Sequence, residues 1–194
     1  MALSPAALYQ QSIDKQRIVI TGQGNAVVGA VVRHVLTQHK RKFDYVGNGQ
    51  AGLLTDAPVL IIEAPVSPEL LDYKHHLGVL SRVEQANSEE LHWLERFANA
   101  TPKSGILIYA DSDSKIKAIA TKERADVLTI PFKTYAHEIQ QGKTLLTAST
   151  QEKFPISLSG DLHLQYLSAA KEVLKKIGIS SGQFYEAITT FQLN

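Results

Sequence analysis

Short apolar runs alternate along the chain with longer segments in which apolar residues recur every three or four positions. The runs include RIVIT at residues 17–21, APVLIIEA at 57–64 and GILIY at 105–109. Continuous apolar runs of this length are typical of strands buried on both faces, whereas the longer period is typical of amphipathic helices. The alternation therefore predicts an α/β fold with a mostly parallel sheet and helices on both faces.

The same pattern predicts where each element lies. Strands are expected at residues 17–21, 43–46, 57–64, 77–83, 105–109 and 126–130, with an antiparallel edge pair at 143–147 and 154–158. Helices are expected at residues 26–38, 88–99 (capped by Ser88), 114–122, 162–177 and 181–191, and a loop is expected at Gly47, Gly49 and Gly52. We expect one domain over residues 17–194, preceded by an N-terminal extension at 1–16.

Ligands of parallel sheets bind at the carboxyl ends of the strands. Residues 21–29, 63–68, 81–87 and 110–113 are expected on that edge. Within it, Thr21-Gly22-Gln23-Gly24-Asn25 joins the first strand to the first long helix. Glycines there would let backbone N–H groups approach a phosphate, and the helix N-terminus would attract its charge. The turn is expected either to bind phosphate or to serve only as a strand-to-helix connection.

Triphosphate chemistry needs a lysine and a hydroxyl for Mg²⁺ after this turn, and Ala26 and Val27 provide neither. The dinucleotide pattern G-x-G-x-x-G is met by Gly22 and Gly24 but not at Val27. Asp44 follows Gly24 by about 20 residues, where a ribose-binding acid is expected. A Rossmann-like dinucleotide-binding protein is therefore one alternative.

Composition limits the other functions. The chain has 194 residues, of which 44% are hydrophobic and 20% charged. A chain of this length and composition can bury a hydrophobic core that is stable without a bound metal. It has no cysteine, which excludes disulfides and thiolate zinc sites. Its net charge of +1 is too small to attract nucleic acid or membranes electrostatically. No signal peptide and no membrane-spanning segment is recognisable in the sequence. We expect a cytoplasmic protein that binds neither.

Four smaller features have mainly structural interpretations. His75 and His76 are expected on a solvated loop, and residues 39–42, with His34, form a basic patch at a helix end. Asp111 and Asp113 are expected to shape a turn and cap the next helix. Trp93 and Phe97 are expected in the core, because they lie at helical spacing in one predicted helix.

Several segments together resemble the central, ATP-binding domain of the Mur ligases, in particular the muramate–alanine and murein-tripeptide ligase branch. They are the Thr-Gly entry to the loop, IIEA at 61–64, VLSRVE at 79–84, and a late helix pair with Gly160, Ala169 and Ala170. Mur ligases join amino acids or peptides to UDP-N-acetylmuramate in peptidoglycan synthesis. The resemblance implies a P-loop-like fold over roughly residues 17–191.

The resemblance also implies which functional groups have changed. The family's loop lysine falls on Ala26 and its Mg²⁺-binding hydroxyl on Val27, while Glu63 matches a metal-binding glutamate. The resemblance therefore implies a catalytically degenerate relative that acts as a binding or partner module, with a protein partner or a nucleotide-sugar ligand. Any remaining site is expected at Thr21, Gly22, Gln23, Gly24, Asn25 and Glu63.

The second alternative is an active ATP-dependent amide ligase, or a fragment of one, with ATP and Mg²⁺ as cofactors. Arg82 takes the place of a family asparagine and would replace the missing lysine. Compared with a complete ligase, we expect the UDP-binding domain before Arg17 and the amino-acid-binding domain after Asn194 to be missing. The chain is therefore expected to be either an excised middle domain or a natural short protein.

Overall fold

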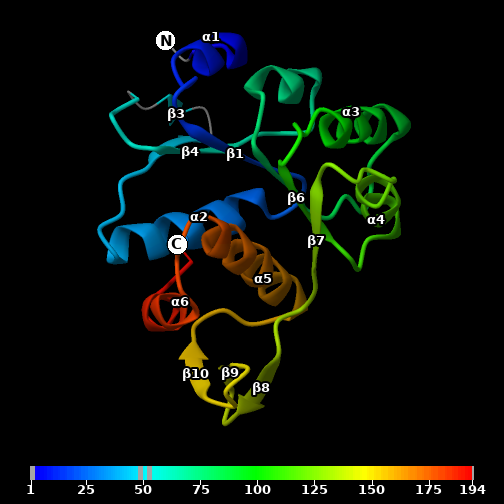
Figure 1. Cartoon of the computed structure of the whole chain (residues 1–194). Helices are drawn as coiled ribbons and strands as arrows, with labels where there is room; N and C mark the ends of the chain where they lie inside the picture. The colour runs from blue at the N-terminus through cyan, green and yellow to red at the C-terminus, as the bar shows by residue number, and fades with distance from the viewer. Residues whose placement is uncertain (1–2, 48–49, 52–53, 194) are drawn as a thin grey trace.

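A mostly parallel sheet forms the centre of the molecule (Figure 1), as predicted. The computed structural model describes residues 3–47, 50–51 and 54–193. The strand order is β3-β2-β4-β1-β5-β6-β7, and every neighbouring pair is parallel except β2 and β3. The strands are β1 (Gln16–Thr21), β2 (Asp44–Gly47), β3 (Gln50–Ala51), β4 (Val59–Glu63), β5 (Leu77–Leu80), β6 (Ile106–Ala110) and β7 (Leu128–Phe132).

Helices cover both faces of this sheet (Figure 1). One face is covered by α2 (Asn25–Gln38), α5 (Asp161–Lys176) and α6 (Ser181–Ile188), and the other by η1 (Pro68–Tyr73), α3 (Ser88–Asn99) and α4 (Ser114–Ala120). The central strands are consequently inaccessible to solvent: Ile18, Val19 and Ile20 of β1 are 0% exposed. Burial on both faces explains why these strands have no alternating polar positions.

The predicted antiparallel pair exists, but it does not lie at the edge of the main sheet. β9 (Lys143–Thr147) pairs with β10 (Lys153–Ile156) and with β8 (His137–Gln140) in a separate three-stranded sheet. The residues of β8 are all exposed. An exposed strand has no apolar face, and this is why the sequence pattern did not indicate β8.

Several boundaries differ from the prediction, and side-chain hydrogen bonds explain two of them. The strand expected at 77–83 ends at Leu80, because the chain then turns so that the Val83 N–H donates to Asp113 Oδ2 at 2.8 Å. Asn87, not Ser88, caps α3, in a capping box with Glu90. Asp113 caps α4 as predicted.

The first residues of the chain also contribute to the core. Ser4 caps α1 (Pro5–Gln10), and Leu8 of this helix is 2% exposed. Of the three glycines expected in a loop, Gly47 ends β2, and Gly49 and Gly52 lie outside the described residues. No helix in the described ranges is long and apolar enough to cross a membrane.

Candidate functional site

The glycine-containing turn lies at the carboxyl end of the central strand β1, where the sequence places it. β1 ends at Thr21, and Gly24 is the N-cap of α2. Gly22 and Gly24 have positive φ values of 94° and 72°, a region that favours glycine. A Cβ on Gly22 would also lie 2.9 Å from the carbonyl oxygen of Ser81. Both glycines are therefore required by the path of the backbone.

Several amide groups at this turn and at the start of α2 are already hydrogen-bonded within the protein. The Gln23 N–H donates to the Arg82 carbonyl oxygen at 2.8 Å, and the Val27 N–H donates to the Gly24 oxygen at 2.9 Å. The Ala26 N–H donates to the Asn25 Oδ1 atom at 2.7 Å. A phosphate cradle needs such donors directed at the ligand. A phosphate bound at these amides would have to displace the bonds that they already make.

A tyrosine ring from α5 packs directly against the start of α2. A Cβ on Gly24 would lie 2.2 Å from Cζ of Tyr166. Tyr166 itself is only 6% exposed. Burial raises the pKa of this phenol, so Tyr166 is neutral at physiological pH. The ring therefore occupies the space beside the helix N-terminus with an uncharged group.

Two polar side chains of the turn, those of Asn25 and Thr21, are directed into the protein, whereas Gln23 is exposed. The Asn25 Nδ2 atom donates to the Ala64 carbonyl oxygen at 3.3 Å, which ties the turn to the end of β4. The Thr21 hydroxyl is buried and has no hydrogen-bond partner among the described residues. Neither group is presented to a ligand at the sheet edge.

Glu63 ends β4 as expected, but its carboxylate lies beneath α2. A Cβ on Gly29 would lie 1.8 Å from Glu63 Oε1, and the Arg33 guanidinium is 3.9 Å from that oxygen. The side chain is 2% exposed, and neither oxygen has a hydrogen bond of good geometry within the described ranges. Burial raises the pKa of Glu63, which the neighbouring Tyr45 and Arg33 partly oppose. Glu63 thus faces the second and third turns of α2 rather than residues 22–25.

Arg82 lies beside the turn but is paired with an acid. Its Nη2 atom is 2.6 Å from Glu84 Oε1, and its side chain is 22% exposed. Hydrogen bonds from Thr134 and Gln165 hold the pKa of Asp161 below its usual range, and Arg82 contributes to this shift. The guanidinium is therefore a cation close to the start of α5, with part of its charge balanced by Glu84.

A groove of about 360 Å³ opens next to the turn, between the connections that follow β4 and β5. Its lining residues are Gly22, Gln23, Pro65, Val66, Val83, Glu84, Gln85, Ala86 and Glu90. The charged residues in this lining are two glutamates, and Glu90 also accepts from the Asn87 N–H. The sequence assigned most of these positions to the carboxyl edge and named Gly22 and Gln23 as site residues. It did not propose the two glutamates, because the motifs drew attention to the turn.

The position of Asp44 contradicts its predicted role as the ribose-binding acid of a dinucleotide site. It is the first residue of β2, so it lies at the amino end of the parallel sheet, opposite the turn. Its carboxylate is 3% exposed, 3.2 Å from Lys15 Nζ, and accepts from the backbone N–H and hydroxyl of Thr55. Asp44 therefore cannot meet a ribose of a dinucleotide bound at Gly22 and Gly24.

Two histidine assignments also change. His75 is not solvated: it is 2% exposed, stacks on Phe97 and shares a hydrogen bond of 2.9 Å with the Thr101 hydroxyl. Burial lowers the pKa of His75 to about 3. In the basic patch, His39 Nε2 lies 2.8 Å from the Gln183 carbonyl oxygen, so this part of the patch packs α2 against α6. Phe97 is fully buried, as expected of a core residue, whereas Trp93 is only partly buried and the Arg96 guanidinium lies 5.1 Å from its ring centroid.

No group of three or more His, Cys, Asp or Glu side chains in the described part of the chain lies close enough together to hold a metal ion. The sequence matches no family model and no curated protein. Its fold, however, matches solved structures over almost its whole length, and these likenesses rest on backbone geometry at low sequence identity.

One similar structure is the UDP-N-acetylmuramate:L-alanyl-γ-D-glutamyl-meso-diaminopimelate ligase from Neisseria meningitides, with a TM-score of 0.81 and 13% identity over 98% of this chain and 70% of that one. Another is the MurF ligase from Thermotoga maritima in complex with ADP, with a TM-score of 0.80 and 10% identity over 98% and 52%. The apo folylpolyglutamate synthase (FPGS) of L. casei matches with a TM-score of 0.72 and 8% identity over 96% and 65%. This chain spans about half of the MurF chain, and its fold is that of the Mur ligase central domain.

Proposed function

We propose that this chain is a non-catalytic domain of the Mur-ligase fold, which acts as a binding or partner module in cell-wall precursor metabolism. The observation that carries the proposal is the closed turn. The N–H groups of Gln23, Ala26 and Val27 bond within the protein, and Tyr166 packs on Gly24. The link to the cell wall rests on the names of the similar ligases.

The residues at the turn do not fit a nucleoside triphosphate with Mg²⁺. Phosphoryl transfer depends on positioning and on charges that stabilise the phosphate oxygens. Ala26 and Val27 supply no charge or hydroxyl at the start of α2, and Glu63 is held under that helix. Glu84 and Glu90 in the neighbouring groove would repel the phosphates.

The groove beside the turn is the proposed binding surface. It joins apolar residues (Pro65, Val66, Val83 and Ala86) with the two glutamates. Such a surface suits a segment of a protein partner, or the amine-bearing peptide of a nucleotide-sugar precursor, better than it suits a triphosphate. The two ligand classes can be separated experimentally.

The test is thermal unfolding of the full chain with ATP and Mg²⁺, ADP, NAD, NADP, or a UDP-N-acetylmuramoyl peptide. A ligand present at 100 times its Kd stabilises the folded state by about 2.7 kcal/mol, which raises the melting temperature measurably. We expect no shift with any nucleotide, whereas the MurF ligase from Thermotoga maritima, which binds ADP, should shift with ADP. A shift with the UDP-muramoyl peptide would identify the groove's ligand, and its absence would direct the search to protein partners. Stabilisation by ATP and Mg²⁺ would overturn the proposal.

A second candidate function is an active amide ligase in which Arg82 replaces the lysine. It is favoured by the position of Arg82: its carbonyl oxygen holds the Gln23 N–H, and its Nε atom is buried without a hydrogen-bond partner among the described residues. This function requires Mg²⁺-dependent ATP binding that is lost in Arg82→Ala and kept in Arg96→Ala, a control on α3. Binding that is equal in the two variants would reject it.

A further inference from the structure

A lysine and two tyrosines meet on the opposite side of α5 from the turn, and we call these three residues the Lys171 cluster. Lys171 lies on α5, Tyr135 precedes β8, and Tyr185 lies on α6. The Lys171 Nζ atom donates to the hydroxyls of both tyrosines, at 3.0 Å for Tyr185, and the two hydroxyl oxygens are 2.6 Å apart.

Aromatic rings surround the ammonium group. Lys171 Nζ lies 4.6 Å from the ring centroid of Tyr185 and 5.5 Å from that of Phe184, and Phe154 stacks on Tyr185 at 4.4 Å. The faces of aromatic rings attract a cation. Burial raises the pKa of Tyr135, and its neighbour Tyr185 raises it further. Tyr135 is therefore a neutral O–H donor at physiological pH.

The cluster contains more donors than its own hydrogen bonds use. An ammonium has three N–H donors and each phenol has one O–H. Two of the N–H groups bind the tyrosine oxygens, and one hydrogen lies between those oxygens. One N–H and one tyrosine O–H thus have no acceptor among the described residues. Two such donors, one of them charged, match the oxygens of a single oxyanion.

An open pocket of about 410 Å³ lies next to these donors. Lys171, Tyr135 and Tyr185 line it together with hydroxyl groups from the small sheet and α5, those of Thr147, Ser149 and Ser168. Lys133 also lines it, although its ammonium pairs with Asp111 at 3.1 Å. No carboxylate is among the described residues that line this pocket. Its charge is therefore opposite to that of the groove beside Gly22.

We propose that this pocket binds a small oxyanion, either a phosphate monoester or a carboxylate, through the Lys171 ammonium and a tyrosine hydroxyl. Lysine binds both groups as a point charge, and the hydroxyl adds a directional hydrogen bond. The cluster joins the small sheet to α5 and α6, and this structural role accounts for the bonds within the cluster. It leaves the two remaining donors and the basic lining of the pocket to a ligand.

The proposal is tested by NMR titration of the uniformly ¹⁵N-labelled full chain with inorganic phosphate and, separately, with glutarate, at constant ionic strength set with sodium chloride. We expect saturable shifts of amides at residues 134–136, 147–149 and 168–171 with at least one of the two anions. Saturation by phosphate alone, or by glutarate alone, identifies which oxyanion the pocket takes. Shifts that grow linearly with both anions would overturn the proposal.

Matched variants separate the site from general charge effects. Lys171→Met should weaken the binding at least tenfold, whereas Lys175→Met, which removes the same charge from an exposed position of the same helix, should change it less than twofold. Tyr185→Phe keeps the ring and removes the hydroxyl, so it also tests the site if Lys171→Met does not fold. Equal affinity in Lys175→Met and in both site variants would contradict the proposal. The readout does not involve residues 21–25, so its failure would be distinct from failure of the proposed function.

Discussion

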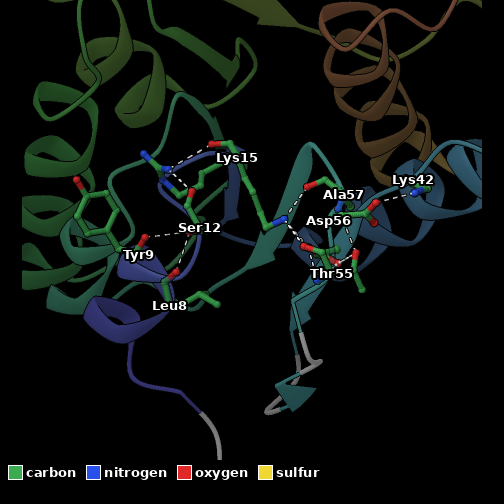
Figure 2. A network of polar contacts seen from close by, with 10 residues as sticks. Leu8, Tyr9, Ser12, Lys15, Lys42, Thr55, Asp56 and Ala57 are labelled. Carbon is green, nitrogen blue, oxygen red and sulfur yellow. Dashed lines mark hydrogen bonds and ion pairs between the residues drawn. The ribbon is translucent and has the colours of Figure 1, made fainter.

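The two edges of the main sheet use their polar residues in opposite ways. At the amino edge, Lys15 reaches the carbonyl oxygens of Thr55 and Ala57 at 2.6 and 2.7 Å and pairs with Asp44, and Figure 2 shows this buried network. At the carboxyl edge, where parallel sheets bind ligands, the start of α2 carries Ala26 and Val27. The buried ion pair of this chain thus stabilises the frame of the sheet and takes no part in the chemistry expected at its other edge.

The comparison shows that different residues build the frame of the sheet and the turn at its carboxyl edge. The strands pack through apolar side chains, so the sheet requires only that the turn connects β1 to α2 along the correct backbone path. The glycines satisfy that path, and Tyr166 fills the space beside them. The frame and the site are separable, and each can be disrupted without the other.

The largest expected effect comes from breaking the amino edge. Lys15→Met removes one partner of a pair whose side chains are 2% and 3% exposed, leaving the Asp44 carboxylate buried without its cation. Such a change costs about 3–5 kcal/mol, measured as a lower free energy of unfolding in urea. The control is Lys42→Met, because Lys42 and Asp56 form a pair with side chains 69% and 78% exposed. That variant should unfold like the unaltered chain, and equal losses in the two variants would mean that Lys15 is not a buried partner.

The next effect comes from the carboxyl edge. Gly24→Ala places a Cβ 2.2 Å from Cζ of Tyr166 at a φ of 72°, so overpacking and backbone strain add to a loss of about 3 kcal/mol. Gly142→Ala has a similar φ of 76° but no atom within 4 Å of the new Cβ. The free energy of unfolding of this variant should fall by about 1 kcal/mol, because only the backbone strain applies there.

A double-mutant cycle sharpens this prediction. Tyr166→Ala removes the ring, so Gly24→Ala should cost less in that background than in the unaltered chain. Identical costs in the two backgrounds would show that Tyr166 does not pack on the turn.

The smallest of these effects depends on pH. An unfolded histidine with a pKa of 6.5 takes up a proton on acidification, whereas folded His75, with a pKa of about 3, does not. Its contribution to stability is therefore complete above pH 6.5 and is lost progressively as the pH falls toward 3. Between pH 7 and pH 5 the chain should lose about 2 kcal/mol more than His75→Gln, a variant that does not titrate. Parallel losses in urea unfolding at the two pH values would place His75 in solvent.

Much of the fold could be predicted from the sequence, because apolar runs encode burial on both faces. The sheet, the helices α2, α3, α4, α5 and α6, and the position of the turn all follow from them. Strand β8 did not, because an exposed strand carries no such pattern. Helix α1 was also missed, because its single buried residue, Leu8, gives no periodic signal.

The site was harder to predict, because local sequence does not encode contacts between distant segments. Tyr166 and Gly24 are far apart in the chain, and no sequence pattern in either segment indicates that the two residues are in contact. Asp44 has the spacing expected of a ribose-binding acid, but it is the first residue of its strand and not the last. It therefore lies at the amino edge of the sheet, whereas a ribose-binding acid would lie at the carboxyl edge. Glu63 was placed at the correct strand end, yet the direction of its side chain depends on Gly29 and Arg33 of α2.

The central claim, that the turn is closed to phosphates, is tested most directly at the turn's own amides. In ¹H–¹⁵N NMR spectra of the full chain, the signals of residues 22–28 should stay in place as ATP and Mg²⁺ are added to millimolar concentration. Saturable shifts of these amides, accompanied by a change in the ring signals of Tyr166, would show that the ring moves aside and that the turn binds a nucleotide, contradicting the account.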